Sequence, residues 1–153
     1  MTTTYSGAKL SISATVPSDL TLAAFQAIAF VTGDCAVKEV PAIMRSWDKV
    51  TDETVCNNSS YDIKGGAKWD PLAFKINRKP SDEAQAIYEA LEDDSNGVGA
   101  FKLELPGGAG TIYFIAQVSK FALADGGTKN TIHTSGVELC LQADPIADYA
   151  AAA

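Results

Sequence analysis

The fold is decided by the stretch from Leu72 to Phe121, which reads LAFKINRKPSDEAQAIYEALEDDSNGVGAFKLELPGGAGTIYFIAQVSKF. Over its first six residues, large apolar side chains alternate with Ala, Lys and Asn, which is the period of two expected of a half-buried strand. Pro80 ends that pattern. From Phe101 the alternation returns, and it continues on the far side of the glycine-rich turn at 106–110. The stretch therefore predicts a strand, a helix and then two further strands.

The helix is expected over about residues 81–94. Ser81 is a candidate N-cap, and acidic residues follow it in the first turn, where the helix dipole favours them. One apolar stripe runs along the segment at the spacing i, i+3, i+4 and i+7, and it consists of Ala84, Ile87, Tyr88 and Leu91. Turn-forming residues at 95–99 end the helix. We expect the stripe to face the core.

The other regular segments are weaker. Alternating or extended character predicts strands at 10–16, 37–49 and 130–142, and Ser18 or Asp19 is expected to cap a short helix. The phase of the last strand slips at Gly136, which predicts a bulge. The chain is thus expected to be a single domain over 1–153, mainly β (α+β), with a flexible N-terminal arm (1–8) and a C-terminal tail (144–153) without structure.

Residues 51–71 are polar and rich in turn formers, yet they include Tyr61 and Trp69. The segment is predicted to be a long loop, and loops of this length in compact domains tend to be functional. Two interpretations stay open: a loop that packs its own aromatic side chains, or a binding loop.

Charge and cysteine usage narrow the class of protein. The net charge is −7, and six acids but no Lys or Arg fall between residues 81 and 100. Tight binding of nucleic acid needs a basic surface, so sequence-specific DNA binding is disfavoured. The three cysteines show no C-x-x-C spacing, which favours a reducing compartment. No secretory signal or membrane span is expected.

Catalytic chemistry is not indicated. His133 is the sole histidine and is expected to be structural or exposed to solvent. Metal-ligand spacing is missing, and the glycines at 107–110 are not followed by the G-K-[ST] of a phosphate loop. Glu89 and Asp93 are expected to be a solvated pair on one helix face. We therefore expect neither enzymatic activity nor a cofactor.

The order of several elements resembles the major tail tube proteins of long, non-contractile-tailed bacteriophages. The elements that carry the resemblance are Leu20-Thr21-Leu22-Ala23-Ala24-Phe25, Lys64-Gly65-Gly66-Ala67, Asp82-Glu83-Ala84-Gln85, Tyr113-Phe114 and Ser119-Lys120-Phe121. The resemblance covers most of the chain. The glycine-rich turn that the family has in the first half is weak here, which leaves the pairing of residues 33–50 open.

The resemblance implies a β-sandwich or barrel with one flanking helix, forming hexameric rings that stack into a tail tube for genome delivery. The implied partners are further copies, the tape measure, tail terminator and distal tail proteins, and viral DNA that passes without specific binding. The protein would occur in the virion tail, and in the host cytoplasm during assembly. Candidates for a ring-stacking loop are Asn57, Asn58, Tyr61 and Asp62, and candidates for lining the lumen are Glu104, Glu138 and Lys102, with Lys102 offset by Glu104 or turned away.

Two alternatives remain. One is a tube protein of a related bacterial secretion or bacteriocin machine. The other is a ligand-binding β-sandwich without enzymatic activity, which would show an exposed aromatic site near Trp47, Tyr61 or Trp69.

Overall fold

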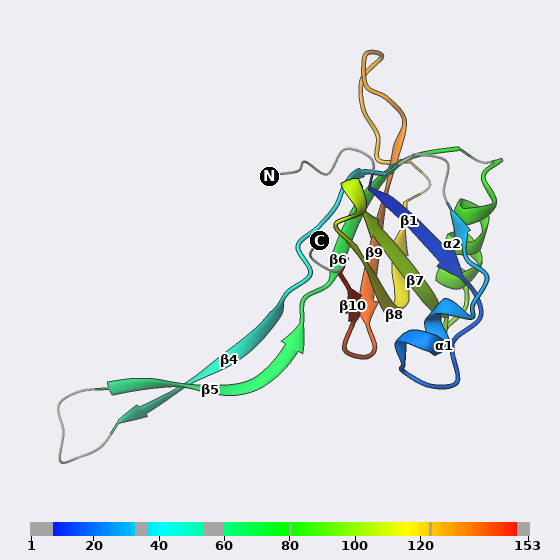
Figure 1. The fold of residues 1–153 in the computed structure, drawn as a ribbon. Helices are drawn as coiled ribbons and strands as arrows, with labels where there is room; N and C mark the ends of the chain where they lie inside the picture. The colour runs from blue at the N-terminus through cyan, green and yellow to red at the C-terminus, as the bar shows by residue number, and fades with distance from the viewer. Residues whose placement is uncertain (1–7, 33–36, 54–59, 80, 123, 150–153) are drawn as a thin grey trace.

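The computed structural model describes residues 8–32, 37–53, 60–79, 81–122 and 124–149. Its body is one antiparallel eight-stranded sheet, and a separate two-stranded hairpin projects from it (Figure 1). In spatial order the sheet contains β2 (Val31–Thr32), β1 (Lys9–Ser13), β7 (Val98–Leu105), β8 (Gly110–Phe121), β9 (Thr134–Leu141), β6 (Leu72–Asn77) and β3 (Val37–Glu39), and β10 (Ile146–Asp148) pairs with β8. The hairpin consists of β4 (Arg45–Glu53) and β5 (Ser60–Trp69), and the helices are α1 (Leu22–Gln26) and α2 (Glu83–Asp93). The mainly β class with a flanking helix is confirmed.

The strands of the deciding stretch form as predicted. In β6 the residues Leu72, Phe74 and Ile76 are buried, and Ala73 and Lys75 between them are exposed. β7 and β8 pair along their whole shared length, from Val98 opposite Gln117 to Leu105 opposite Gly110. A single 3-10 turn, Pro106–Gly108, joins them, and Gly107 has a φ of 70°, a conformation that glycine adopts without steric cost.

Helix α2 begins one residue later than expected. Its N-cap is Asp82, and not Ser81, because the extended backbone of Asp82 lets its carboxylate accept a hydrogen bond of 3.2 Å from the Ala84 amide. The apolar stripe faces the core as predicted: Ala84, Tyr88 and Leu91 are buried, and Ile87 is half-buried. The helix ends at the predicted place, with Asp94 as its C-cap.

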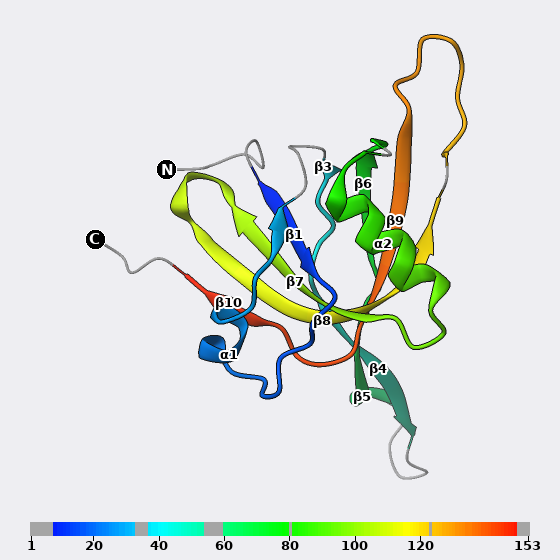
Figure 2. The ribbon, with the colours of Figure 1, turned by 90° about the vertical axis from the view of Figure 1, so that its right-hand side faces the viewer.

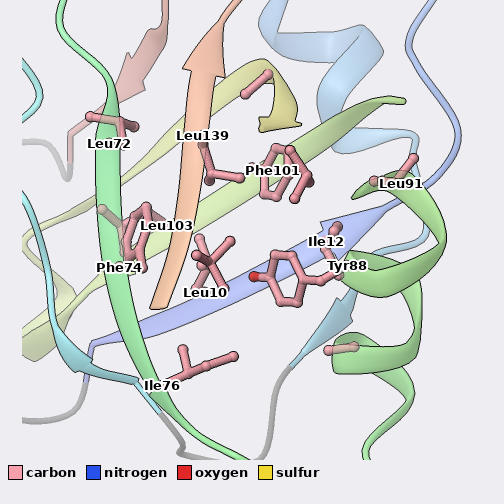
Figure 3. Packing of buried hydrophobic residues seen from close by; sticks show 14 of the residues in the cluster. Leu10, Ile12, Leu72, Phe74, Ile76, Tyr88, Leu91, Phe101, Leu103 and Leu139 are labelled. Atoms are coloured by element: carbon pink, nitrogen blue, oxygen red, sulfur yellow. The ribbon is translucent and has the colours of Figure 1, made fainter. Parts of the chain in front are cut away.

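The core lies between α2 and one face of the sheet, as Figure 3 shows. The ring of Tyr88 stacks on Phe101, with 6.1 Å between the centroids, and Phe101 stacks on Phe114 at 5.3 Å. Burial, and secondarily the charge of Asp82, raises the pKa of the Tyr88 hydroxyl well above its usual range.

A buried polar side chain ties α2 to the end of β6. Gln85 is 1% exposed, although the apolar stripe does not include it. Its amide nitrogen donates to the Asn77 carbonyl at 2.7 Å, and its amide oxygen accepts from the Lys79 backbone N–H at 2.8 Å and from Arg78 Nη1 at 3.1 Å. These bonds satisfy the polar groups of the buried Gln85 amide and link it to the backbone at the end of β6.

The second face of the sheet is partly covered by α1 and the segment after it. Phe25 is buried there against Tyr113, at a centroid distance of 5.6 Å, and Phe30 also contacts Tyr113 at 6.1 Å. The N-cap of α1 is Thr21, whose hydroxyl accepts from the Ala24 amide at 3.2 Å, so the expectation of Ser18 or Asp19 is wrong. The helix starts where Phe25 can reach this second apolar cluster.

Two further expectations about strands need correction. β1 ends at Ser13, because the Ser13 hydroxyl accepts from the Thr15 amide at 3.1 Å and turns the chain, which leaves Val16 41% exposed. The pairing of β9 with β6 is continuous through Gly136, so no bulge interrupts it there. The irregularity lies opposite β9, between Val118 and Lys120 of β8.

The end of the chain also carries more structure than expected. Within the segment 144–153, which was predicted to be an unstructured tail, Ile146–Asp148 form β10 and pair with Thr111–Tyr113 of β8. Ile146 packs into the cluster around Phe25 and Tyr113. The packing of this one apolar side chain stabilises the pairing of the segment with β8. The arm 1–8 lies outside the described residues apart from Ala8.

The predicted long loop at 51–71 is wrong. Residues 51–53 belong to β4 and residues 60–69 to β5, so most of the segment is one arm of the hairpin. The predicted extended segment 37–49 is likewise two strands, with β3 at the edge of the sheet and Pro41 between β3 and β4. Figures 1 and 2 both show the hairpin pointing away from the body and from α2.

Candidate assembly surfaces

The hairpin has two different faces that are set by its register. Arg45 lies opposite Trp69, Trp47 opposite Ala67, and Lys49 opposite Lys64. The register shifts between Trp47 and Lys49, where one residue, Asp48, faces the pair Gly65 and Gly66, as in a β-bulge. A Cβ on Gly65 would come within 3.1 Å of both the Asp48 carbonyl and the Val50 side chain, so the close approach there favours glycine.

One face of the hairpin is a ladder of cations and indole rings. The Arg45 guanidinium lies 5.0 Å from the centre of the Trp47 ring and 5.8 Å from the Trp69 ring. The Lys64 ammonium lies 5.4 Å from the Trp47 ring. Each exposed contact of this kind contributes about 0.5–1 kcal/mol. We call this surface, formed by Arg45, Trp47, Lys49, Lys64 and Trp69, the cationic face.

The opposite face of the hairpin carries apolar side chains near its far end. Val50 lies opposite Ile63, and the two are 54% and 52% exposed. Lys68, opposite Ser46, shares this second face nearer the base. Large apolar side chains exposed next to one another are typical of surfaces that another chain covers.

The base of the hairpin is fixed to the body. Within the base itself, the Ser46 hydroxyl donates to the carboxylate of Asp70, the residue after β5, at 2.8 and 2.9 Å. The Trp69 indole N–H donates to the carboxylate of Asp144 at 2.7 Å, so it reaches the segment just before β10. The direction in which the hairpin leaves the body is therefore defined by side-chain hydrogen bonds as well as by chain connectivity.

Two of the four residues predicted for ring stacking, Tyr61 and Asp62, lie on the far part of β5. Asp62 lies opposite Thr51 on β5 and accepts a hydrogen bond of 3.0 Å from its hydroxyl. Tyr61 lies opposite Asp52. Asn57 and Asn58 lie outside the described residues.

The three candidates for the lumen share the face of the sheet that points away from α2. The Lys102 ammonium lies 2.9 Å from a carboxylate oxygen of Glu104, so the expected offset of this lysine by Glu104 is present. Glu138 lies opposite Lys120 and forms an ion pair with it at 3.7 Å. Both acids on this face therefore have a lysine beside them, and the assignment of the three residues to a lumen stays a prediction.

The outer side of α2 is acidic and hollowed. Glu89 forms an ion pair with Arg78, whereas Glu92 and Asp93 are exposed and make no ion pair with any described residue. A groove of about 660 Å³ runs along this side, and its lining consists of Ala86, Glu89, Ala90, Glu92, Asp93 and Phe121. Phe121 forms its apolar floor, held by Tyr88 and by the Arg78 guanidinium.

The described part of the chain offers no metal-binding group of three or more His, Cys, Asp or Glu side chains. His133 is exposed just before β9, and it is its backbone carbonyl that accepts a hydrogen bond, from the Arg78 N–H at 3.1 Å. The helices that can be described are too short or too polar to cross a bilayer.

The cationic face was missed because its members come from two strands. Sequence reasoning noted the exposed aromatic residues Trp47 and Trp69 but not the cations beside them. The signal was present, since Arg45, Trp47 and Lys49 alternate with period two in β4.

The sequence matches no family model, and no curated protein is similar to it. The structure is similar to a chain in the cryo-EM structure of the anti-feeding prophage (AFP) baseplate, which was determined with six-fold symmetry. The TM-score is 0.66 at 11% sequence identity, and the match covers 92% of this chain and 91% of that chain. The two chains therefore share a fold over almost their entire lengths.

Proposed function

We propose that this protein is a structural subunit of a phage-tail-like particle, in which six copies form a ring and rings stack into a tube. The observation that carries the proposal is the fold that nearly the whole chain shares with a chain of a six-fold symmetrised prophage baseplate. The order of elements in the sequence, which resembles that of tail tube proteins, supports it independently. The chain would then act by assembly and without enzymatic activity or a cofactor.

The sheet face that points away from α2 would line the channel. DNA must pass such a wall without being held, and a wall of unpaired lysines would bind phosphates at every ring. On this face Lys102 is paired with Glu104, and Lys120 with Glu138. Lys9 and Lys75 are exposed on the same face, and in the strand register they lie opposite Glu104 and Glu39. An acid beside or opposite each lysine would limit the attraction of this face for phosphates.

The acidic helix α2 would face the outside of the tube. It packs on the sheet face opposite the one that carries Lys102 and Glu104, so both surfaces cannot line one channel. The acidity of residues 81–100 is therefore not a property of the lumen in this arrangement. The acidic surface of α2 would then be available for contacts between subunits.

The hairpin would connect one ring to the next. It projects from the body, its base is fixed by Ser46 and Trp69, and its far part exposes Val50 and Ile63. An element that protrudes from a small domain with an apolar end gains partners only in another chain. A heterologous contact of this kind repeats without closing and produces a filament.

A place in the baseplate, at the end of the tube, is the second candidate. It is favoured by the same similarity, because the similar chain belongs to a baseplate. The partners would be other tail proteins in either case: tape measure, terminator or distal tail components along a tube, and the central proteins of the baseplate at its end.

Assembly of the purified protein tests the proposal. Sedimentation velocity and negative-stain electron microscopy of the concentrated protein should show rings, alone or stacked. Compact monomers alone at millimolar concentration, without rings or tubes in the micrographs, would contradict it. Rings that never stack would favour the baseplate position over the tube.

A further inference from the structure

We propose that the cationic face of the hairpin docks into the acidic groove of helix α2 on a second copy of this chain. The inference rests on the proposed function and identifies the two surfaces that would meet between stacked rings. It is carried by complementary charge and by complementary shape, each present in the described residues.

The cations of the hairpin make no ion pair with any described residue, and Asp62, which shares the face of Lys64, accepts a hydrogen bond from Thr51. Arg45 and Lys64 are exposed, and their contacts are with the indole rings of Trp47 and Trp69. Lys49 lies on the same face, opposite Lys64. Cations held over an aromatic ring keep their charge available to an incoming carboxylate. Arg and Trp are also the residue types that most often dominate binding energy in interfaces.

The groove supplies two carboxylates, Glu92 and Asp93, that make no ion pair with any described residue. Glu92 and Asp93 line its rim, and only Glu89 is neutralised, by Arg78. Ala86, Ala90 and Phe121 form an apolar interior. A concave surface with an apolar floor and charged rim accommodates an exposed indole ring such as Trp47, which is 41% exposed in the single chain.

The two surfaces cannot meet within one chain. In Figure 1 the hairpin leaves the body on the side opposite α2, and its base is fixed by the Trp69–Asp144 hydrogen bond. A second copy is favoured over nucleic acid as the occupant, because the chain itself offers a matching acidic groove and has a net charge of −7.

Charge reversal on each surface tests the inference. One variant carries Arg45→Glu and Lys64→Glu, and the other carries Glu92→Lys and Asp93→Lys. Each alone places like charges across the proposed contact, which should raise the protein concentration needed for stacking by at least about tenfold. An equimolar mixture of the two should restore stacking, because every acidic hairpin then finds a basic groove and every basic hairpin an acidic one.

Matched controls separate the contact from general charge effects. Lys68→Glu reverses one charge on the opposite face of the hairpin, and Glu83→Lys reverses one charge in the first turn of α2, outside the groove. Both should stack like the wild type. Circular dichroism of every variant checks folding, and if a double variant does not fold, Lys64→Gln and Glu92→Gln replace the pair and should each weaken stacking.

The outcomes distinguish this inference from the proposed function. Wild-type protein that forms no rings contradicts both. Wild-type stacks that persist in both double variants, or variants that fail even when mixed, overturn the inference alone. A labelled DNA oligonucleotide that binds the wild type and not the Arg45→Glu, Lys64→Glu variant, with stacking unchanged, would assign the cationic face to nucleic acid instead.

Discussion

Leu91→Ala probes the helix on which the core depends. Leu91 is 8% exposed, and its Cδ1 lies so close to β7 that a Cβ on Gly99 would come within 2.7 Å of it. Removing three buried carbons costs about 2.4 kcal/mol at about 0.8 kcal/mol each. The cavity left against the rigid backbone of Gly99 adds to this, so we expect a total of about 3 kcal/mol. For a chain of this size the melting temperature should fall by about 6–12 °C.

Thermal unfolding followed by circular dichroism measures this effect. The protein must be dilute, because assembly would stabilise the folded subunit through mass action. Glu92→Ala is the matched control on the next residue of α2: its side chain is exposed, and the change should stay within about 0.5 kcal/mol. A melting temperature that Leu91→Ala leaves unchanged would refute the reasoning, since the stripe would then not be buried in the folded subunit.

Three further predictions concern the cap, the buried tyrosine and the channel. Asp82→Ala should lower the free energy of unfolding in urea by about 1 kcal/mol, whereas Ser81→Ala should change it little. A larger loss of stability in Ser81→Ala than in Asp82→Ala would identify Ser81 as the N-cap instead. Because burial keeps Tyr88 protonated in the folded state, wild-type stability should be full below the usual tyrosine pKa near 10 and fall above it by up to about 1.4 kcal/mol per pH unit. Tyr88→Phe should remove this loss of stability at alkaline pH. A Tyr88→Phe variant whose stability depends on pH as the wild type's does would show that Tyr88 does not cause the loss. Glu104→Lys with Glu138→Lys should leave assembly intact and slow DNA release from particles, and release at the wild-type rate would exclude both residues from the channel wall.

In the stretch from Leu72 to Phe121, β6 was predictable because it has one buried face, whereas β8 is buried on both faces from Tyr113 to Ala116 and forms a continuous apolar run. Leu72, Phe74 and Ile76 point to the core, and the alternation in the sequence records that directly. The start of the helix was displaced by one residue, since Ser81 and Asp82 are both good N-cap residues and only the backbone geometry chooses between them. Burial of Gln85 depends on backbone groups at the end of β6, whose positions are known only once the sheet has formed.

The hairpin was not predictable by the same means. It has no core side, so apolar residues such as Val50 and Ile63 are exposed and no alternation between inside and outside marks its strands. The bulge at Gly65 and Gly66 shifts the phase in the middle of β5, and glycine pairs suggest a turn when only local sequence is considered.

The candidate surfaces also differ in how far the sequence alone predicts them. The pairing of Lys102 with Glu104 follows from their spacing of two on one strand, so it could be predicted. The cationic face depends on register between β4 and β5, which places Lys64 beside Trp47 across the hairpin. The acidic groove needs Phe121 from β8 as its floor, and no local pattern brings that residue to α2.

Cryo-electron microscopy of the concentrated protein tests the central claim most directly. The account predicts rings of six subunits in which the sheet face with Lys102 and Glu104 points to the axis and α2 lies outside. Particles without rotational symmetry, or rings with α2 turned toward the axis, would contradict it.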